Sequence, residues 1–218
     1  LPLYMDELTN MKSMELSNLA YQLTGGRQRG RMSASSNVER ARGKVWKLLS
    51  VTTGNTSVVE MIGMAKSMPK AEAQRILEHK ATKQNYYTKA ETDEFTSRLS
   101  QNYGHAGKVY IKYVLNNIEE VKKLLNQIQR RVDEKAGLTA ENRFWSVLVA
   151  CTMTGLVIAK RLDLIQYDTK KIFDWAIKCL KENKRQVEEM SVSVEETLND
   201  YIHEHWSNVL WIKSTDDL

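Results

Sequence analysis

Cysteine and proline are both scarce in this chain, with two residues of each among 218. The two cysteines, Cys151 and Cys179, lie inside helix-like patterns. A scaffold held by disulfide bonds is therefore not expected, and a reducing compartment fits better. Proline and glycine are the residues least compatible with helix interiors, so two prolines and ten glycines predict a largely helical fold.

Long hydrophobic runs are also missing. The longest uncharged run extends from Phe144 to Ala159 between Arg143 and Lys160. It is shorter than the roughly 18 apolar residues that indicate a membrane span. We expect a buried core helix at this position and no membrane partner, and no signal peptide is visible.

Common catalytic and metal-binding motifs are absent from the sequence. The chain has four histidines, and "HEHW" does not have the spacing of the zinc motif H-E-x-x-H. His203 and His205 are two residues apart, so on a helix they point in nearly opposite directions and do not easily share one ion. No G-x-S-x-G nucleophile elbow occurs. Zinc and serine-nucleophile chemistry are not expected.

Positive charge is moderately in excess and is concentrated in one segment. The formal net charge is +5, which mildly favours polyanionic partners. One segment between two predicted strands is rich in basic residues and has one acid, Glu39: Arg27, Arg29, Arg31, Arg40, Arg42, Lys44 and Lys47. Such a loop can hold a nucleic-acid backbone, can provide an arginine finger, or is simply solvated.

Two regions of the chain follow different patterns. Residues 1–83 mix short apolar runs with helix-like spacing, whereas residues 84–218 read almost entirely as helix. In the first region we expect buried strands at 1–5 and 45–51, a third strand at 75–80, and helices at 12–23 and 58–66. In the second region, the helices include one with a stripe from 118 to 132, a central helix at 143–162, and one with a stripe from 172 to 180.

Two capping boxes mark further helix starts in the second region. Thr88 with Glu91, and Ser193 with Glu196, have the required three-residue spacing. The second box precedes a helix carrying Leu198, and residues 208–214 are expected to form an edge strand or an extended tail.

Asp6 and Glu7 follow the first predicted strand directly. In P-loop ATPases an acid at such a strand tip holds Mg²⁺, and a neighbouring Glu polarises the attacking water. Asn55 ends the "TTGN" stretch after the second strand, where such enzymes place a polar residue that senses the γ-phosphate. The alternative is that both stretches are ordinary solvated turns.

Order and spacing of several elements resemble a known family. The stretch "LYMDELTNM…LAYQLTGGRQRGRMSASSNVERARGKVWKLLSVTTGN" is similar to the ATPase core of phage and mobile-element primase-helicases. Further on, "NYGHAGKVYIKYVL" and "ENRFWSVLVACTMTG" are similar to two later segments of that family. The resemblance covers most of the first 165 residues.

The resemblance implies roles for individual residues. Asp6 and Glu7 correspond to the pair that acts on Mg²⁺ and water, and Asp6 is the implied metal ligand. Arg29 and Arg31 correspond to two basic catalytic positions of the loop, where the family commonly has Lys and then Arg. Asn55 departs from the family, which often has Glu there. Nucleic-acid contacts are expected from Arg27, Arg40, Arg42 and Lys44.

The phosphate loop G-x-x-x-x-G-K-[ST] is not found in this sequence. We therefore expect the chain to be part of a larger ATPase: an α/β partial P-loop core of the AAA+-like kind over 1–83, followed by a helical domain over 84–218. ATP and Mg²⁺ are the cofactors implied for the longer protein, with no tight binding to this chain alone. The implied partners are single-stranded DNA, the N-terminal ATPase half and further copies in a ring, in the cytoplasm of a bacterial host.

Two other interpretations remain open. One is a helical nucleic-acid-binding module without enzymatic activity, and the other is an oligomerisation module using the region from Tyr87 to Asn117. Tyrosines alternate with lysines there, at Tyr103, Lys108, Tyr110, Lys112 and Tyr113. This interleaving suits base stacking, although packing along helix seams is more common.

Overall fold

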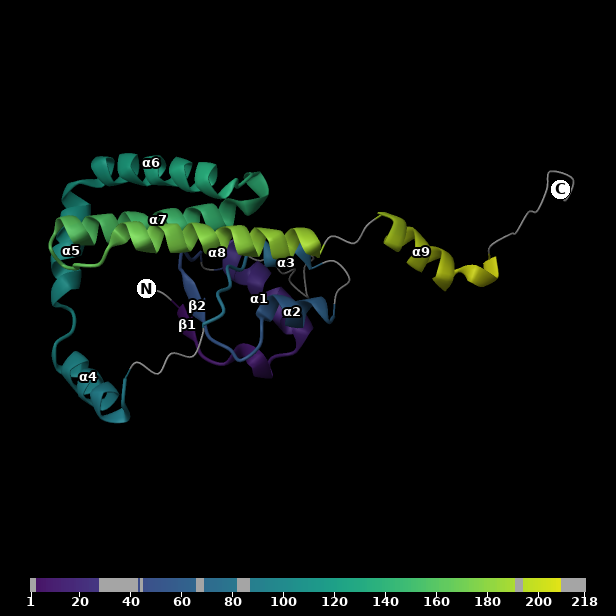
Figure 1. The fold of residues 1–218 in the computed structure, drawn as a ribbon, viewed down its shortest axis with the longest axis horizontal. Coiled ribbons are helices and arrows are strands. Elements are labelled where there is room, and N and C mark those ends of the chain that lie inside the picture. Colours follow the sequence, from purple (N-terminus) through teal and green to yellow (C-terminus); the bar gives the residue numbers. More distant parts are fainter. Residues whose placement is uncertain are drawn as a thin grey trace, which may run out of the picture.

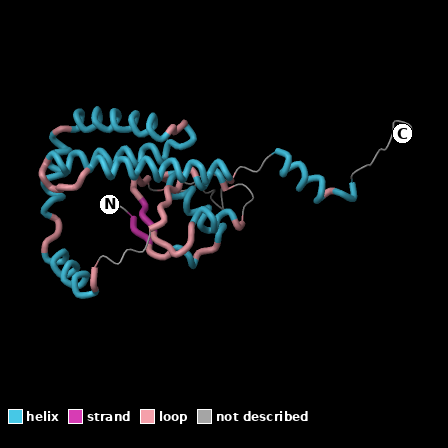
Figure 2. Tube along the Cα trace, viewed as in Figure 1, coloured by secondary structure: helices cyan, strands magenta, loops and turns pink. Residues whose placement is uncertain are grey.

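The computed structural model describes residues 3–27, 43, 45–65, 69–81, 87–190 and 194–208 (Figure 1). Over these ranges the chain is mostly helical, with a small parallel sheet near the amino terminus (Figure 2). The predicted order, an α/β part followed by helices, is confirmed at this level.

The sheet consists of β1 (Leu3–Met5) and β2 (Ser50–Thr52), paired in parallel with Met5 opposite Thr52. Helix α1 (Ser13–Gly25) connects them, preceded by the 3₁₀ turn η1 (Leu8–Asn10). Residues 1 and 2 of the first predicted strand lie outside the described ranges, and the strand predicted at 45–51 is wrong except for its last two residues. The strands are not buried: the exposed fractions of Leu3 and Tyr4 are 37% and 62%. Two short strands cannot form a sheet wide enough to be covered on both faces.

A small core lies under α1. Leu8, Leu16 and Ile62 are buried together, with Met5 and Ile76 packed against them. Ile62 belongs to α2 (Val58–Gly63), and the short helix α3 (Lys70–Ala73) follows. The predicted helix over 58–66 is confirmed as far as residue 63, and residues 66–68 lie outside the described ranges.

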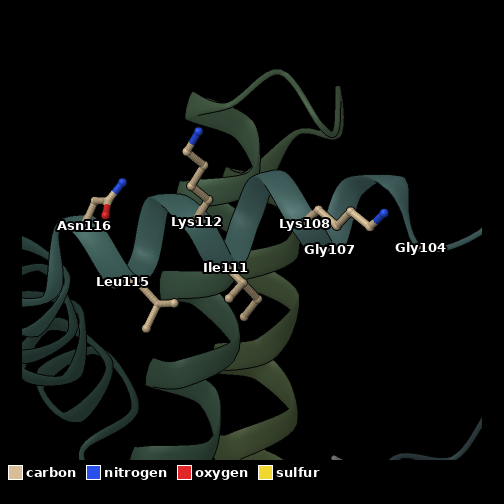
Figure 3. A pocket seen from close by; sticks show the side chains of 7 residues that line it. All are labelled: Gly104, Gly107, Lys108, Ile111, Lys112, Leu115 and Asn116. Atoms are coloured by element: carbon tan, nitrogen blue, oxygen red, sulfur yellow. The ribbon is translucent and has the colours of Figure 1, made fainter.

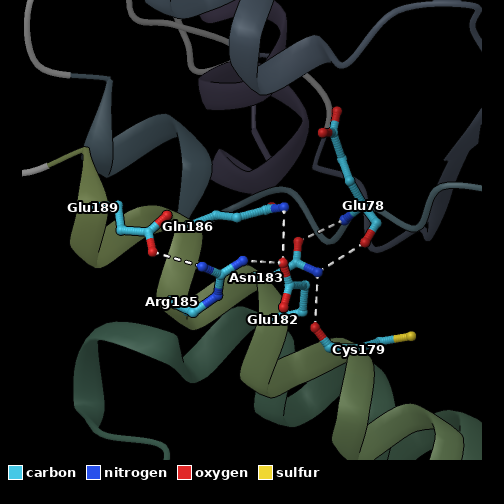
Figure 4. Close-up of polar contacts among 7 residues, drawn as sticks. All are labelled: Glu78, Cys179, Glu182, Asn183, Arg185, Gln186 and Glu189. Atoms are coloured by element: carbon cyan, nitrogen blue, oxygen red, sulfur yellow. Dashed lines mark hydrogen bonds and ion pairs between the residues drawn. The ribbon is translucent and has the colours of Figure 1, made fainter.

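Residues 75–80 do not form the predicted third strand: residues 74–75 turn at the end of α3, and 76–80 carry no regular structure. Side chains of two distant helices provide the hydrogen-bond partners instead. The Trp145 indole Nε1 donates to the carbonyl oxygen of Ile76 over 2.8 Å. The Asn183 amide accepts from the Glu78 backbone N–H over 3.0 Å and donates to the Glu78 carbonyl over 2.8 Å (Figure 4). The segment predicted as a strand is thus held by two side chains instead.

Five helices follow: α4 (Lys89–Gln101), α5 (His105–Asn116), α6 (Ile118–Ala136), α7 (Arg143–Arg161) and α8 (Thr169–Glu189). The 3₁₀ turn η2 (Ala140–Asn142) precedes α7. The capping box of Thr88 and Glu91 at the start of α4 is confirmed. Hydrogen bonds from the Thr88 backbone and hydroxyl to the Glu91 carboxylate lower the pKa of Glu91.

Helices α6, α7 and α8 pack together, and α7 is the central one (Figure 1). Its buried residues include Trp145, Val149, Ala150, Met153 and Ile158. Among the described helices, residues Ala140–Arg161 are long and apolar enough to cross a membrane by length and composition, and 44% of the most apolar window is buried inside the protein. The helix is therefore longer than the uncharged run suggested, and the expectation that it is too short to span a membrane is not supported. Its packing against α6 and α8 confirms the expected core helix.

The two ends of this bundle are defined by polar contacts. At one end, Arg161 of α7 pairs with Glu120 near the start of α6 over 3.0 Å. At the other end, the Lys184 ammonium of α8 donates to the Gly137 carbonyl after α6 over 2.6 Å. Helix α8 therefore runs from the end near α5 to the opposite end.

Helix α9 (Val194–Glu204) and the turn η3 (Trp206–Asn208) end the described part. The predicted helix carrying Leu198 is confirmed. Ser193 of its predicted capping box lies outside the described residues, as does the predicted tail beyond Asn208.

Replacing Asn183 by alanine should destabilise the protein. The side chain is 7% exposed, and its loss leaves the backbone N–H and carbonyl of Glu78 without their amide partner. Glu78 is half-buried, so each of its two unpaired groups should cost about 1–2 kcal/mol, and we expect a loss of roughly 2–4 kcal/mol in the free energy of unfolding. Urea unfolding followed by circular dichroism measures it, with Asn199→Ala on the exposed surface of α9 as the control. A change within about 0.5 kcal/mol, as for ordinary surface substitutions, would contradict this role.

Candidate functional site

The acid pair lies where the two parallel strands end. The Thr53 hydroxyl donates to Asp6 Oδ1 directly after β1 and β2. Backbone bonds extend the pairing past the strands: the Thr53 N–H donates to the Met5 carbonyl over 3.2 Å, and the Leu8 N–H donates to the Thr53 carbonyl over 3.3 Å. Asp6 and Glu7 are both exposed. The carboxyl ends of the strands therefore hold an accessible carboxylate in a fixed position.

Glu7 has an unusual backbone conformation, with φ 54° and ψ 63°. This left-handed region costs a non-glycine residue about 1–2 kcal/mol. Asp163 is the other described non-glycine residue with positive φ, and it follows the end of α7, where left-handed residues commonly terminate helices. Glu7 follows a strand, so helix termination does not explain it. Strained residues cluster at functional sites, which makes Glu7 a candidate.

Asn55 is exposed in the turn after β2, and its side chain makes no hydrogen bond to another described residue. The contact across the strand ends is made by Thr53 instead. The sequence pattern did not point to Thr53, because the prediction relied on Asn55, the last polar residue of the turn. The parallel register, with Met5 opposite Thr52, places Thr53 opposite Asp6 and is the signal that identifies it.

The two ends of the basic segment are joined by backbone contacts. Arg27 forms an isolated antiparallel bridge with Val45, and the Trp46 N–H donates to the Gly26 carbonyl over 2.8 Å. Gly26 has φ 65°, and a Cβ there would lie 3.1 Å from the Trp46 carbonyl oxygen, so glycine fits the close approach. The remaining predicted basic site residues lie outside the described residues: Arg29, Arg31, Arg40, Arg42 and Lys44.

The bridge between Arg27 and Val45 is not at the end of the sheet that carries the acid pair. Arg27 and Val45 come before β2, on the amino side of the strands, whereas Asp6 and Glu7 follow β1 on the carboxyl side. Asp6 therefore contacts Thr53, whereas Arg27 lies away from both of these residues.

No group of three or more His, Cys, Asp or Glu side chains suited to a metal ion occurs among the described residues. Asp6 as a Mg²⁺ ligand does not require such a group. Mg²⁺ commonly keeps several waters and uses one or two carboxylates together with phosphate oxygens of the substrate. An exposed carboxylate oriented by a threonine hydroxyl fits this pattern.

The helices carry a second candidate surface. One face of α5 forms a shallow, open surface lined by Gly104, Gly107, Lys108, Ile111, Lys112, Leu115 and Asn116 (Figure 3). On the inner side, burial raises the pKa of Tyr110, and the neighbouring Cys151 adds to the rise. Tyr113 is also half-buried, as seam packing predicts, whereas Tyr87 and Tyr103 are 77% and 76% exposed.

No protein-family model, curated protein or solved structure matches this chain.

Proposed function

We propose that this chain is part of an ATP-dependent DNA helicase motor of phage or mobile-element replication. The observation that supports it is a hydrogen bond across the carboxyl ends of two parallel strands. There the Thr53 hydroxyl donates to the Asp6 carboxylate, beside Glu7. Open α/β sheets bind ligands at the carboxyl ends of their strands. Among the described residues each of β1 and β2 pairs with a single strand, so the outer edge of each can pair with further strands of a larger sheet.

Each residue has a distinct part in this proposal. Asp6 holds Mg²⁺, directly or through water, and Thr53 fixes the direction of its carboxylate. Glu7 orients and polarises the water that attacks the γ-phosphate. Asn55 contacts that phosphate or water from the neighbouring turn. Bound Mg²⁺ neutralises the charge that develops on the phosphate oxygens.

Other parts of the motor come from outside this chain. Because the sequence contains no phosphate loop, another segment of a longer protein, its N-terminal ATPase half, provides the backbone N–H groups that surround the phosphates. The basic segment starts on the amino side of the strands, so Arg29 or Arg31 acts on the nucleotide of a neighbouring copy in a ring. The remaining basic residues hold single-stranded DNA, in the cytoplasm of a bacterial host.

The rate of ATP hydrolysis by the longer gene product, with and without single-stranded DNA, tests this proposal. We expect turnover that DNA stimulates, and none above background from the chain of 218 residues alone. A normal rate from the isolated chain would show that the nucleotide site does not need an additional segment. No turnover by the longer product under either condition would refute the motor.

A nucleic-acid-binding module without turnover is the second candidate. The exposed rings of Tyr87 and Tyr103, on either side of α4, favour it because exposed aromatic rings stack on unpaired bases. It predicts salt-dependent binding of single-stranded DNA with no hydrolysis, which the same samples distinguish.

A further inference from the structure

A cysteine and a histidine from distant parts of the chain meet at the surface of α8. The thiol of Cys179, on α8, lies 3.5 Å from Nδ1 of His79, which belongs to the irregular segment after α3. The two residues are 100 positions apart, so no spacing motif in the sequence reveals the pair. Thiolate sulfur and imidazole nitrogen are the ligand types that zinc prefers in structural sites.

The separation of these two atoms fits a tetrahedral zinc ion. Zinc lies about 2.3 Å from a sulfur ligand and about 2.0–2.1 Å from a nitrogen ligand, so at a tetrahedral angle the two ligand atoms are about 3.5 Å apart. Cys179 Sγ and His79 Nδ1 already have this separation. Neither side chain has to move away from the other to accommodate the ion.

The pair is held in place by its neighbours. The Asn183 amide donates to the Glu78 carbonyl, next to His79, over 2.8 Å and to the Cys179 carbonyl over 2.9 Å (Figure 4). The Trp175 ring contacts the His79 imidazole edge to face, with 4.9 Å between the ring centroids. Metal sites depend on such supporting groups, because they fix the orientation of the ligands before the ion binds.

We propose that His79 and Cys179 form one half of a zinc site, and that the same pair of a second copy completes it. Structural zinc sites have four protein ligands, and two cysteines with two histidines are one of the common sets. In the part of the chain that the structure describes, no third His, Cys, Asp or Glu side chain joins the pair in a metal-binding group. A two-fold axis through the ion brings identical surfaces together and supplies the missing cysteine and histidine.

The surface around the pair suits this contact. His79 is exposed, and Trp175 beside it is 49% exposed. Tryptophan is among the residues that contribute most to protein interfaces, so Trp175 adds apolar contact area next to the ion. The two thiolates of the completed site balance the double positive charge of zinc. The neighbouring Lys178 is therefore not placed beside a net positive charge.

The experiment adds zinc chloride to the metal-free chain, kept reduced so that no disulfide forms. It measures molar mass by light scattering after size-exclusion chromatography, and the zinc content of each peak. We expect zinc to double the molar mass, with one ion for every two chains, and a chelator to reverse the change. Cobalt in place of zinc should give the strong visible absorption of a tetrahedral ion with thiolate ligands.

Matched variants separate this site from other cysteines and histidines. Cys179→Ser and His79→Ala should each abolish the zinc-dependent dimer and the cobalt absorption. Cys151→Ser and His105→Ala remove the same residue types at other exposed positions and should retain both. All four variants should keep the helical circular dichroism of the wild type.

Three results would each overturn the proposal. The first is a chain that binds no zinc, which would leave the pair as a hydrogen bond alone. The second is one ion per chain without dimerisation, which would show that water completes the site. The third is zinc-dependent dimerisation that survives Cys179→Ser, which would place the ion elsewhere.

Discussion

Glu7→Gln in the longer protein is expected to lower DNA-stimulated ATP hydrolysis by about 100-fold or more. The substitution keeps the size of the side chain but removes the negative oxygen that polarises the attacking water in the proposed function. Binding of ATP should change little, because the proposed function assigns Mg²⁺ to Asp6 and the phosphates to a separate phosphate loop. The measurement is steady-state phosphate release with saturating single-stranded DNA, so that the change appears in kcat and not in KM.

Glu60→Gln is the matched control, since Glu60 is an exposed carboxylate on α2. It should retain the wild-type rate. Thr53→Ala removes the hydroxyl that donates to Asp6 and should raise the Mg²⁺ concentration needed for half-maximal rate. If Glu7→Gln hydrolyses ATP at the wild-type rate, the acid pair is structural and the binding module becomes the better interpretation.

Trp145→Ala is expected to lower the free energy of unfolding by about 3–5 kcal/mol. The side chain is 1% exposed within the main core, and its indole nitrogen donates to the Ile76 carbonyl. The loss combines a large cavity with an unpaired carbonyl, and most domains have only about 5–15 kcal/mol in total. Guanidinium unfolding followed by circular dichroism measures it.

Trp145→Phe separates the two contributions. It keeps most of the apolar volume and removes the hydrogen bond, so it should cost less than Trp145→Ala. Trp175→Ala is the surface comparison: Trp175 is 49% exposed and makes an edge contact with His79, so its loss should cost about 1.5 kcal/mol or less. Equal effects at Trp145 and Trp175 would contradict the assigned role.

Hydrophobic spacing correctly predicted the helices whose apolar face can be recognised from their own sequence. The stripe from Ile118 to Val132 and the apolar run around Val149 became α6 and α7, because a helix that shows an apolar face can bury it only against neighbours. The tip of β1 was also predicted, since a strand followed by two acids must end in accessible carboxylates. Thr53 follows from the register and not from the local sequence.

The remaining features depend on contacts between distant residues. Ile76 and Leu77 are as apolar as residues of a strand, but the backbone of this stretch bonds to the side chains of Trp145 and Asn183 instead of to another strand. Asn183 looks like any polar residue on a helix with many charges, and nothing within its own helix indicates its role. The exposure of β1 and β2 could not be predicted from their sequences. Burial of a strand depends on what packs against it elsewhere in the chain.

The bond between Asn183 and Glu78 also determines when this part of the chain can finish folding. The two residues are 105 positions apart. A ribosome adding about 5–20 residues per second takes roughly 5–20 s to synthesise that interval. Until α8 has emerged, the Glu78 backbone lacks its amide partner, whereas the N–H groups of Val58 and Val59, which the Glu78 carboxylate accepts from in the folded chain, are already synthesised. The amino-terminal segment therefore spends seconds partly assembled, and any factor that binds nascent chains meets it in that state.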